Sequence, residues 1–129
     1  MLADMIISHP APRRPLAFIA GGETVVKLTG TGKGGRNQEL ALSAAIGMEG
    51  SPAMAVFSVG SDGTDGPTDA AGGYVDHETC AELKQQSIDI YQVLQNNDAY
   101  HALKKVDGLI VTGPTGTNVN DVAVGLLDI

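Results

Sequence analysis

Three polar loops, each directly after a short apolar segment, restrict the fold of this chain more than any other feature of its sequence. The apolar segments at 24–28, 53–60 and 108–112 are expected strands. The loops at 30–35, 61–73 and 113–120 follow them in that order. Strands that run in the same direction bring the loops after them to one edge of a sheet, where open α/β sheets bind their ligands. Loops longer than about 12 residues are uncommon unless they are functional. The sequence therefore predicts an α/β domain with one polar, backbone-rich edge.

Helical segments are expected between these strands. The spacing of Leu40, Ala44 and Met48 predicts a helix from residue 36 to about 47, and further helices are expected at 1–8, 77–86, 90–96 and 98–105. A strand at 16–20 is expected to form a hairpin with 24–28 around Gly21–Gly22. The strands at 53–60 and 108–112 are expected to be buried, the former on both faces. Residues 122–129 are expected to form a strand or a short helix. The expected fold class is α/β, as a layered α/β/α domain with a mixed sheet and polar, glycine-rich loops after the strands.

Size, charge and cysteine content exclude several classes of protein. A chain of 129 residues is the length of one domain, and a net charge of −7 disfavours a nucleic-acid binder. No apolar run approaches the roughly 20 residues of a membrane helix, and the single cysteine, Cys80, excludes an intrachain disulfide. We expect a cytoplasmic protein in which residues 1–15, with three prolines, are a linker or the end of a preceding helix and 16–129 are the domain.

The first loop has the chemistry of an anion site. Gly30, Gly32 and Gly35 match the G-x-G-x-x-G pattern of dinucleotide-binding loops, but Asp62, the acidic residue after the next strand, lies 27 residues beyond Gly35 instead of about 20. Exposed backbone N–H groups and a helix N-terminus attract anions, and Lys33 and Arg36 add positive charge. An arginine in the first helical turn is unfavourable against the helix dipole unless an anion lies nearby. The alternative is a surface loop with two solvated bases.

The second loop concentrates carboxylates. Asp62, Asp65 and Asp69 lie within eight residues, and no lysine or arginine occurs between Arg36 and Lys84. Asp62 and Asp65 are candidate ligands of Mg²⁺, which needs only one or two carboxylates when phosphate oxygens and waters complete its shell. Either carboxylate could instead accept a proton from a hydroxyl group. Turns in which aspartate side chains bond to the backbone are the alternative.

The third loop offers hydroxyl and amide groups. Thr115, Thr117, Asn118 and Asn120 can hydrogen-bond a sugar, a hydroxy acid or phosphate oxygens. A turn dense in bonds from side chains to the backbone is an equally acceptable interpretation. The three histidines have no metal-type spacing, and the Cys80 thiol is expected to be buried and unreactive.

Five motifs occur in the order that is typical of one known family. They are Gly21-Gly-Glu-Thr24, Gly34-Gly-Arg-Asn-Gln-Glu-Leu40, the Asp62–Gly72 segment, Asn97-Asp98 and the Thr112–Asp121 segment. Together they resemble the MOFRL domain, the C-terminal domain of glycerate 2-kinases, which are also labelled hydroxypyruvate reductases. The resemblance extends from about Leu16 to Ile129.

The resemblance implies a kinase site shared between two domains. Such enzymes transfer the γ-phosphoryl group of ATP to the 2-hydroxyl of D-glycerate with Mg²⁺, and a larger N-terminal domain, absent from this chain, is the expected partner. In such a site we expect Arg36 to bind the glycerate carboxylate or a phosphate, and Lys33 and the Gly30–Gly35 amides to stabilise phosphate charge. Asp62 or Asp65 would hold Mg²⁺ or orient the hydroxyl. The expected substrate-binding residues are Gly34, Gly35, Asn37, Thr115, Thr117, Asn118 and Asn120.

Two other functions stay open at this point. A reductase of hydroxypyruvate that uses NAD(P)H would fit the glycine pattern, and a non-catalytic ligand-binding or assembly module would fit the length of the chain. We expect the isolated domain to be inactive, because phosphoryl transfer needs charge neutralisation from all sides. No nucleic-acid or membrane partner is expected, and self-association into a homo-oligomer stays open.

Overall fold

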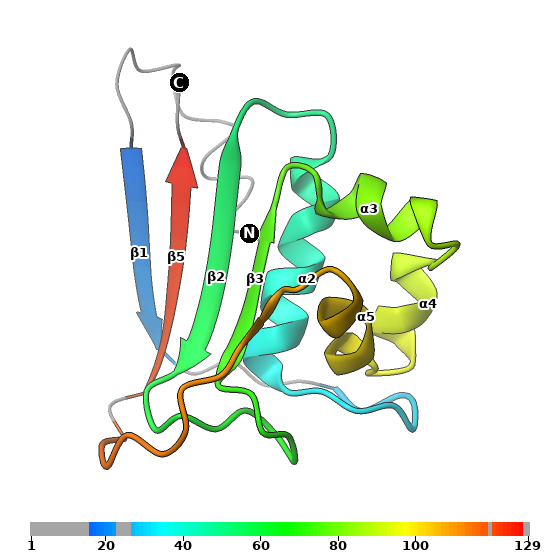
Figure 1. The fold of residues 1–129 in the computed structure, drawn as a ribbon. Helices are drawn as coiled ribbons and strands as arrows, with labels where there is room; N and C mark the ends of the chain where they lie inside the picture. The colour runs from blue at the N-terminus through cyan, green and yellow to red at the C-terminus, as the bar shows by residue number, and fades with distance from the viewer. Residues whose placement is uncertain (1–15, 23–26, 119, 128–129) are drawn as a thin grey trace.

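The fold is that of a computed structural model, which describes residues 16–22, 27–118 and 120–127 (Figure 1). Its elements are β1 (Leu16–Gly22), α2 (Arg36–Met48), β2 (Met54–Gly60), β3 (Gly72–Asp76), α3 (Thr79–Gln85), α4 (Ile90–Gln95), α5 (Ala99–Lys105), β4 (Leu109–Ile110) and β5 (Asp121–Leu127). The helices expected from residue 36 to residue 105 are confirmed, with ends that differ by at most two residues. The helix expected at 1–8 lies outside the described residues.

The sheet has the order β1-β5-β2-β3-β4, and every neighbouring pair is antiparallel. The expectation of a mixed sheet is therefore wrong. Its physical reason is that β5 lies between β1 and β2, so the crossover through α2 joins two parallel strands that are not neighbours. Because directions alternate along this order, β1, β2 and β4 run the same way. The loops after these three strands consequently leave the sheet at one edge, at the bottom of Figure 1.

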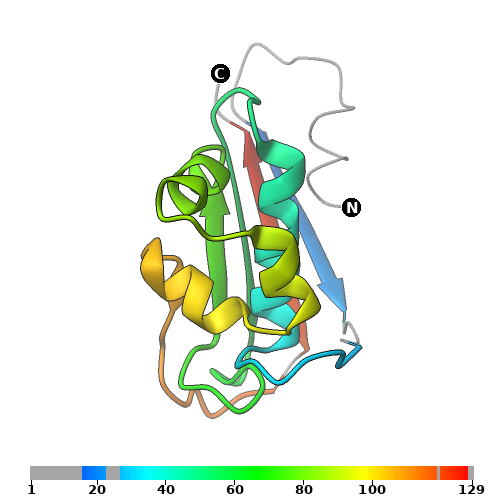
Figure 2. The ribbon, with the colours of Figure 1, turned by 90° about the vertical axis from the view of Figure 1, so that its right-hand side faces the viewer.

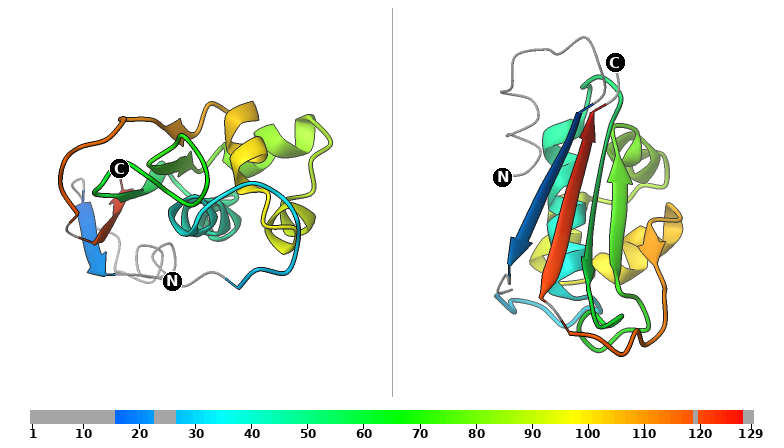
Figure 3. Two further views of the ribbon diagram at one scale, coloured as in Figure 1. Left: turned by 90° about the horizontal axis from the view of Figure 1, so that it is seen from below. Right: turned by 90° about the vertical axis from the view of Figure 1, so that its left-hand side faces the viewer.

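The α/β class is confirmed, but the described helices form one layer instead of two. Figures 2 and 3 show α2, α3, α4 and α5 on the same face of the sheet. Residues along β2 and β5 alternate between buried and partly or fully exposed, which is typical of a sheet with one fully covered face. The expectation that the strand at 53–60 is buried on both faces is therefore wrong, and the α/β/α layering is not found among the described residues.

The turn expected at Gly21–Gly22 is wrong, and most of the second strand of the expected hairpin lies outside the described residues. Gly21 and Gly22 belong to β1 instead of a turn, and β1 pairs with β5 over its whole length. Lys27 and Leu28 lie outside any strand, and residues 24–26 lie outside the described part. The strand β3 was not expected, because it begins with two glycines, which weaken strand propensity. A side chain at Gly73 would lie 2.7 Å from Leu103, so glycine lets α5 approach the sheet.

The core lies between α2 and the centre of the sheet. Ala41, Leu42 and Met48 of α2 are fully buried and belong to one cluster with Val56 of β2 and Val75 of β3. This packing fixes the axis of α2 against β2, so the first turn of α2 is held at the edge where the polar loops meet. No helix in the described part of the chain is long and apolar enough to span a membrane.

A candidate ligand site at the three-loop edge

We call residues 27–35, 61–71 and 111–120, without residue 119, the three-loop edge. Its loops contact one another directly. The Ser61 amide donates to the Asn120 carbonyl at 3.2 Å, and the Thr115 amide donates to the Asp62 carbonyl at 3.4 Å. The second loop reaches the first through Asp65, whose carboxyl carbon would lie 2.4 Å from a side chain at Gly35. The three segments singled out in the sequence therefore form one continuous surface.

The turn between α4 and α5 holds the first loop. Five consecutive backbone N–H groups, those of residues 29–33, all donate to Asn96, Asn97 or Asp98 at distances between 2.7 and 3.0 Å. A side chain at Gly30 would meet Asn96 at 2.3 Å and one at Gly32 would meet Asp98 at 2.4 Å. The glycine pattern is thus explained by close packing against the same chain, and these five amides are not available to a phosphate in this structure.

Lys33 of the first loop contacts Tyr100 of α5. Its Nζ is 4.3 Å from the centre of the Tyr100 ring, an arrangement that stabilises the cation on the aromatic face. The Tyr100 hydroxyl donates to Asp69 at 2.8 Å, and this hydrogen bond raises the pKa of Tyr100 above its ordinary value. Lys33 and Asp69 therefore both contact Tyr100, the cation at the face of the ring and the carboxylate at the hydroxyl.

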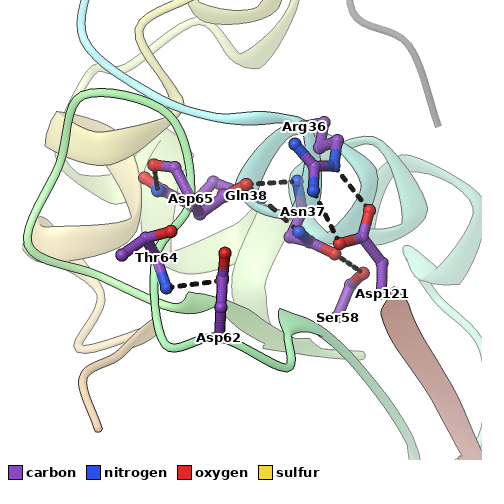
Figure 4. A network of polar contacts seen from close by, with 8 residues as sticks. All are labelled: Arg36, Asn37, Gln38, Ser58, Asp62, Thr64, Asp65 and Asp121. Carbon is purple, nitrogen blue, oxygen red and sulfur yellow. Dashed lines mark hydrogen bonds and ion pairs between the residues drawn. The ribbon is translucent and has the colours of Figure 1, made fainter. Parts of the chain in front are cut away.

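The anion expected at the N-terminus of α2 is supplied by the protein itself. Oδ1 of Asp65 accepts hydrogen bonds from the Asn37 amide at 3.0 Å and from Asn37 Nδ2 at 3.1 Å, and Oδ2 accepts from the Gln38 amide at 2.8 Å (Figure 4). Asp65 is 1% exposed, so it caps the helix from a remote loop, a function that Gly35 at the N-cap position cannot serve. Both of its oxygens are engaged.

A buried polar network extends from this cap. Ser58 of β2 donates to Asn37 Oδ1 at 2.7 Å, and Gln38 Nε2 donates to Thr68 at 3.0 Å. Ser58, Asn37 and Gln38 are all fully buried. Strand β2, the first turn of α2 and the second loop are therefore locked together by hydrogen bonds that water cannot replace.

The charged form of the Glu39 carboxyl, in the same helical turn, is disfavoured by its surroundings. Burial raises the pKa of its carboxyl above the ordinary value, the hydrogen bond from Asn97 Nδ2 at 2.9 Å acts in the opposite direction, and the charge of Asp65 raises it again. Asn97 Nδ2 also donates to the Lys27 carbonyl at 3.1 Å. Asn97 therefore connects the first loop with α2 as well as with α4.

Arg36, the first residue of α2, forms a two-point ion pair with Asp121, the first residue of β5. Its Nε lies 2.6 Å from Oδ2 and its Nη2 lies 2.9 Å from Oδ1. The side chain of Arg36 is 33% exposed, whereas that of Asp121 is 8% exposed. The guanidinium plane is thus set by a buried carboxylate on a strand, while part of the group still faces solvent.

Asp62 lies between Asp65, which caps α2, and the Arg36–Asp121 ion pair (Figure 4). Its Oδ1 accepts from the Thr64 amide at 3.0 Å, and Figure 4 shows its carboxylate pointing toward the first turn of α2. A side chain at Gly60 would meet Asp62 Oδ1 at 3.2 Å and Asn37 Nδ2 at 3.6 Å, so both groups flank Gly60. Asp62 Oδ2 accepts no hydrogen bond from any residue that the structure describes.

The hydroxyl groups of the third loop are used to fix that loop. Thr115 Oγ1 and Thr117 Oγ1 both donate to the Ser61 carbonyl, the latter at 3.2 Å. Asn118 and Asn120 are exposed, and Asn120 has a φ of 69°, which an asparagine tolerates better than most residues. All four residues are exposed at the same edge, and the two threonines bond with their hydroxyl groups to the Ser61 carbonyl.

The predicted site residues fall into those that present polar groups at the edge and those that are buried or bonded within the protein. Arg36, Asp62, Asn118 and Asn120 present polar groups at the edge, whereas Asp65 and Asn37 are buried, and Thr115 and Thr117 are bonded to Ser61. Among the described residues, no group of three or more His, Cys, Asp or Glu side chains could hold a metal ion by itself. Two partners were not predicted from the sequence: Asp121 as the partner of Arg36, and Asn96–Asp98 as the support of the first loop. The Asn97-Asp98 motif was a signal for the second of these.

Comparison with known proteins agrees with the motif order. A model of the MOFRL family matches residues 16–121. A D-glycerate 2-kinase from Thermotoga maritima is 61% identical over 115 residues, which cover 89% of this chain and 28% of that protein. A relative from Agrobacterium vitis, named as a hydroxypyruvate reductase, is 42% identical over 117 residues, covering 89% of this chain and 30% of that protein.

A solved structure is similar over the same region. The crystal structure of a glycerate kinase from Thermotoga maritima superposes with a TM-score of 0.92 at 54% identity, covering 98% of this chain and 31% of that one. This chain therefore spans less than a third of the length of the relatives it matches.

Proposed function

The chain belongs to the MOFRL family, and on this basis we propose that it forms one wall of the site at which a D-glycerate 2-kinase phosphorylates glycerate with ATP. The observation that carries this proposal is the position of Arg36, whose guanidinium is held at the edge where all three polar loops meet. The other walls would come from the larger part of such an enzyme that this chain does not match.

Arg36 is proposed to bind the carboxylate of glycerate or a phosphate. A guanidinium group presents its donors in a rigid plane, which suits two-point recognition of either anion. Asp121 already orients that plane, so little conformational entropy is lost when an anion binds. The partial exposure of the Arg36 side chain keeps the group within reach of a ligand.

Asp62 fits a role as Mg²⁺ ligand better than Asp65 does. Both oxygens of Asp65 accept hydrogen bonds within the protein, whereas Asp62 Oδ2 accepts none from the described residues. A single carboxylate suffices when phosphate oxygens and waters complete the octahedral shell of Mg²⁺. When bound, Mg²⁺ would neutralise phosphate charge. Asp62 could also accept a hydrogen bond from the 2-hydroxyl of glycerate and so orient it.

The phosphate contacts of this wall are proposed to come from few groups. Because the amides of residues 29–33 are used internally, the Lys33 ammonium and the Gly34–Gly35 backbone remain as candidates. Asn118 and Asn120 are the candidate substrate contacts of the third loop. Thr115 and Thr117 would act by holding that loop against the second one.

Charge explains why this wall would not act alone. Asp62, Asp65, Asp69 and Asp121 carry four negative charges at or beside the edge, against the three positive charges of Lys27, Lys33 and Arg36. Phosphoryl transfer requires neutralisation of the phosphates and precise positioning from all sides. We therefore propose that the isolated chain has no kinase activity and that further cations come from Mg²⁺ and from the rest of the enzyme.

The geometry does not favour dinucleotide binding at the first loop. In a dinucleotide site the glycine-rich loop offers free amides to the pyrophosphate, but here these amides bond to residues 96–98. The name of the Agrobacterium vitis relative nevertheless makes the reductase the competing activity to measure.

A chimeric enzyme tests the proposal. The segment of the Thermotoga maritima kinase that matches this chain is replaced by this chain, which is feasible at 61% identity. We expect ATP-dependent phosphorylation of D-glycerate within about tenfold of the parent enzyme, since a misplacement cost of about 1.4 kcal/mol has that effect on rate. Reduction of hydroxypyruvate with NADH or NADPH is measured in parallel and is expected to be absent. A folded chimera that reduces hydroxypyruvate or has no kinase turnover would contradict the proposal.

A further inference from the structure

We propose that Asp121 is a positioning residue, which sets the orientation of the Arg36 guanidinium before any ligand binds. The inference rests on the proposed function, because it concerns how Arg36 meets its anion. Its starting point is geometric: two parallel hydrogen bonds, from Nε and Nη2 of Arg36 to the two carboxylate oxygens of Asp121, fix both the position and the plane of the guanidinium (Figure 4).

The carboxylate is attached to a rigid element. Asp121 is the first residue of β5 and lies opposite Gly22 of β1 and Gly60 of β2, so it is paired on both sides within the sheet. It is 7% exposed and belongs to the same face of β5 as the buried residues Ala123 and Leu127. A side chain so confined has few alternative rotamers, and an arginine bonded to it at two points inherits that order.

The position of Arg36 in the helix makes such a partner necessary. A cation at the first position of α2 is repelled by the positive end of the helix dipole. Asp65 uses its two oxygens on the backbone amides of Asn37 and Gln38, and so it caps the helix. Asp121 therefore offsets the cost of placing Arg36 here and selects one direction for its long side chain.

If the Arg36–Asp121 ion pair positions Arg36 for its ligand, weakening the pair lowers kcat/KM. If the pair is purely structural, weakening it leaves kcat/KM unchanged. In the chimeric kinase, Asp121→Asn keeps the shape of the side chain but removes its charge and one of its two acceptor oxygens. We expect kcat/KM for D-glycerate to fall about 10- to 100-fold, because misplacement of a binding group by about 1 Å has effects of this size. Asp107→Asn, the same chemical change at an exposed site away from the edge, is the matched control and is expected to leave kcat/KM unchanged.

A double-mutant cycle provides the decisive readout. If Asp121 acts through Arg36, adding Asp121→Asn to Arg36→Ala produces no further loss beyond about twofold, whereas independent sites give losses that multiply. Multiplying losses, or an Asp121→Asn chimera with wild-type kcat/KM, would overturn the positioning role while leaving the proposed function intact. If Arg36→Ala itself has no effect, Arg36 is not a ligand-binding group and both conclusions are overturned.

A second measurement does not depend on activity. In ¹H–¹⁵N spectra of the ¹⁵N-labelled chain, the Arg36 Nε–H should exchange slowly with water, because it donates to a buried carboxylate. In Asp121→Asn we expect this exchange to accelerate by at least about tenfold as the bond weakens, while amide signals of the core remain in place. An Nε–H that exchanges equally fast in both proteins would show that Asp121 does not orient Arg36, and would contradict the inference even if the chimera were inactive.

Discussion

Replacing Asp65 with alanine is expected to lower the free energy of unfolding by about 3–5 kcal/mol, the range found when a buried polar network loses its central acceptor. The change removes the acceptor of the Asn37 and Gln38 amides and of Asn37 Nδ2, all in a region where these side chains are fully buried. Each buried donor left without a partner costs about 1–3 kcal/mol. The N-terminal turn of α2 would also lose its cap.

The measurement is urea unfolding of the 129-residue chain followed by circular dichroism. Asp65→Asn retains one carbonyl oxygen and is expected to cost about half as much as Asp65→Ala, since about half of the acceptor capacity remains. Asp107→Asn, at an exposed position, serves as the control and should change the free energy by less than about 0.5 kcal/mol. If Asp65→Ala costs no more than this control, Asp65 is not the cap of α2.

Replacing Gly63 with alanine is expected to cost about 3 kcal/mol, because it combines backbone strain with a steric clash. Gly63 has a φ of 87°, and a Cβ there would lie 2.1 Å from the Gly113 carbonyl oxygen. The second and third loops would have to separate. Gly116→Ala is a closely matched control, since Gly116 has a φ of 77° but nothing within 4 Å of its Cβ position. Strain alone predicts about 1 kcal/mol for this control.

The difference between the two glycine variants measures the contact between the loops. Both are compared by urea unfolding under the same conditions. Equal costs for Gly63→Ala and Gly116→Ala would mean that the clash is relieved without penalty, and that the second and third loops are not held against each other as the structure has them.

Local sequence signals predicted the helices and the loops well. The apolar spacing from Leu40 to Met48 gave α2 nearly its full length, and the glycine-, aspartate- and threonine-rich composition marked the three segments that meet at one edge. The requirement for an anion near Arg36 was also inferred correctly from the helix dipole. These features depend on residues close together in the chain.

The partners that satisfy those requirements could not be identified from the sequence. Asp65 and Asp121 lie 28 and 85 residues away from Asn37 and Arg36, and each could equally have been a turn residue or a metal ligand. The position of β5 between β1 and β2 decides which carboxylate reaches Arg36, and strand order is a tertiary property. Likewise, the glycine pattern of the first loop is the same whether the loop packs against a pyrophosphate or against residues 96–98.

The steady-state kinetics of Arg36→Ala in the chimeric kinase is the experiment on which the functional interpretation depends. We expect kcat/KM for D-glycerate or for ATP to fall about 100- to 1,000-fold, as is typical when one preorganised charged donor is removed from a reacting site. Unfolding of the variant is monitored in parallel to exclude loss of structure. A correctly folded Arg36→Ala chimera with undiminished kcat/KM for both substrates would show that the three-loop edge is not a wall of the phosphoryl-transfer site.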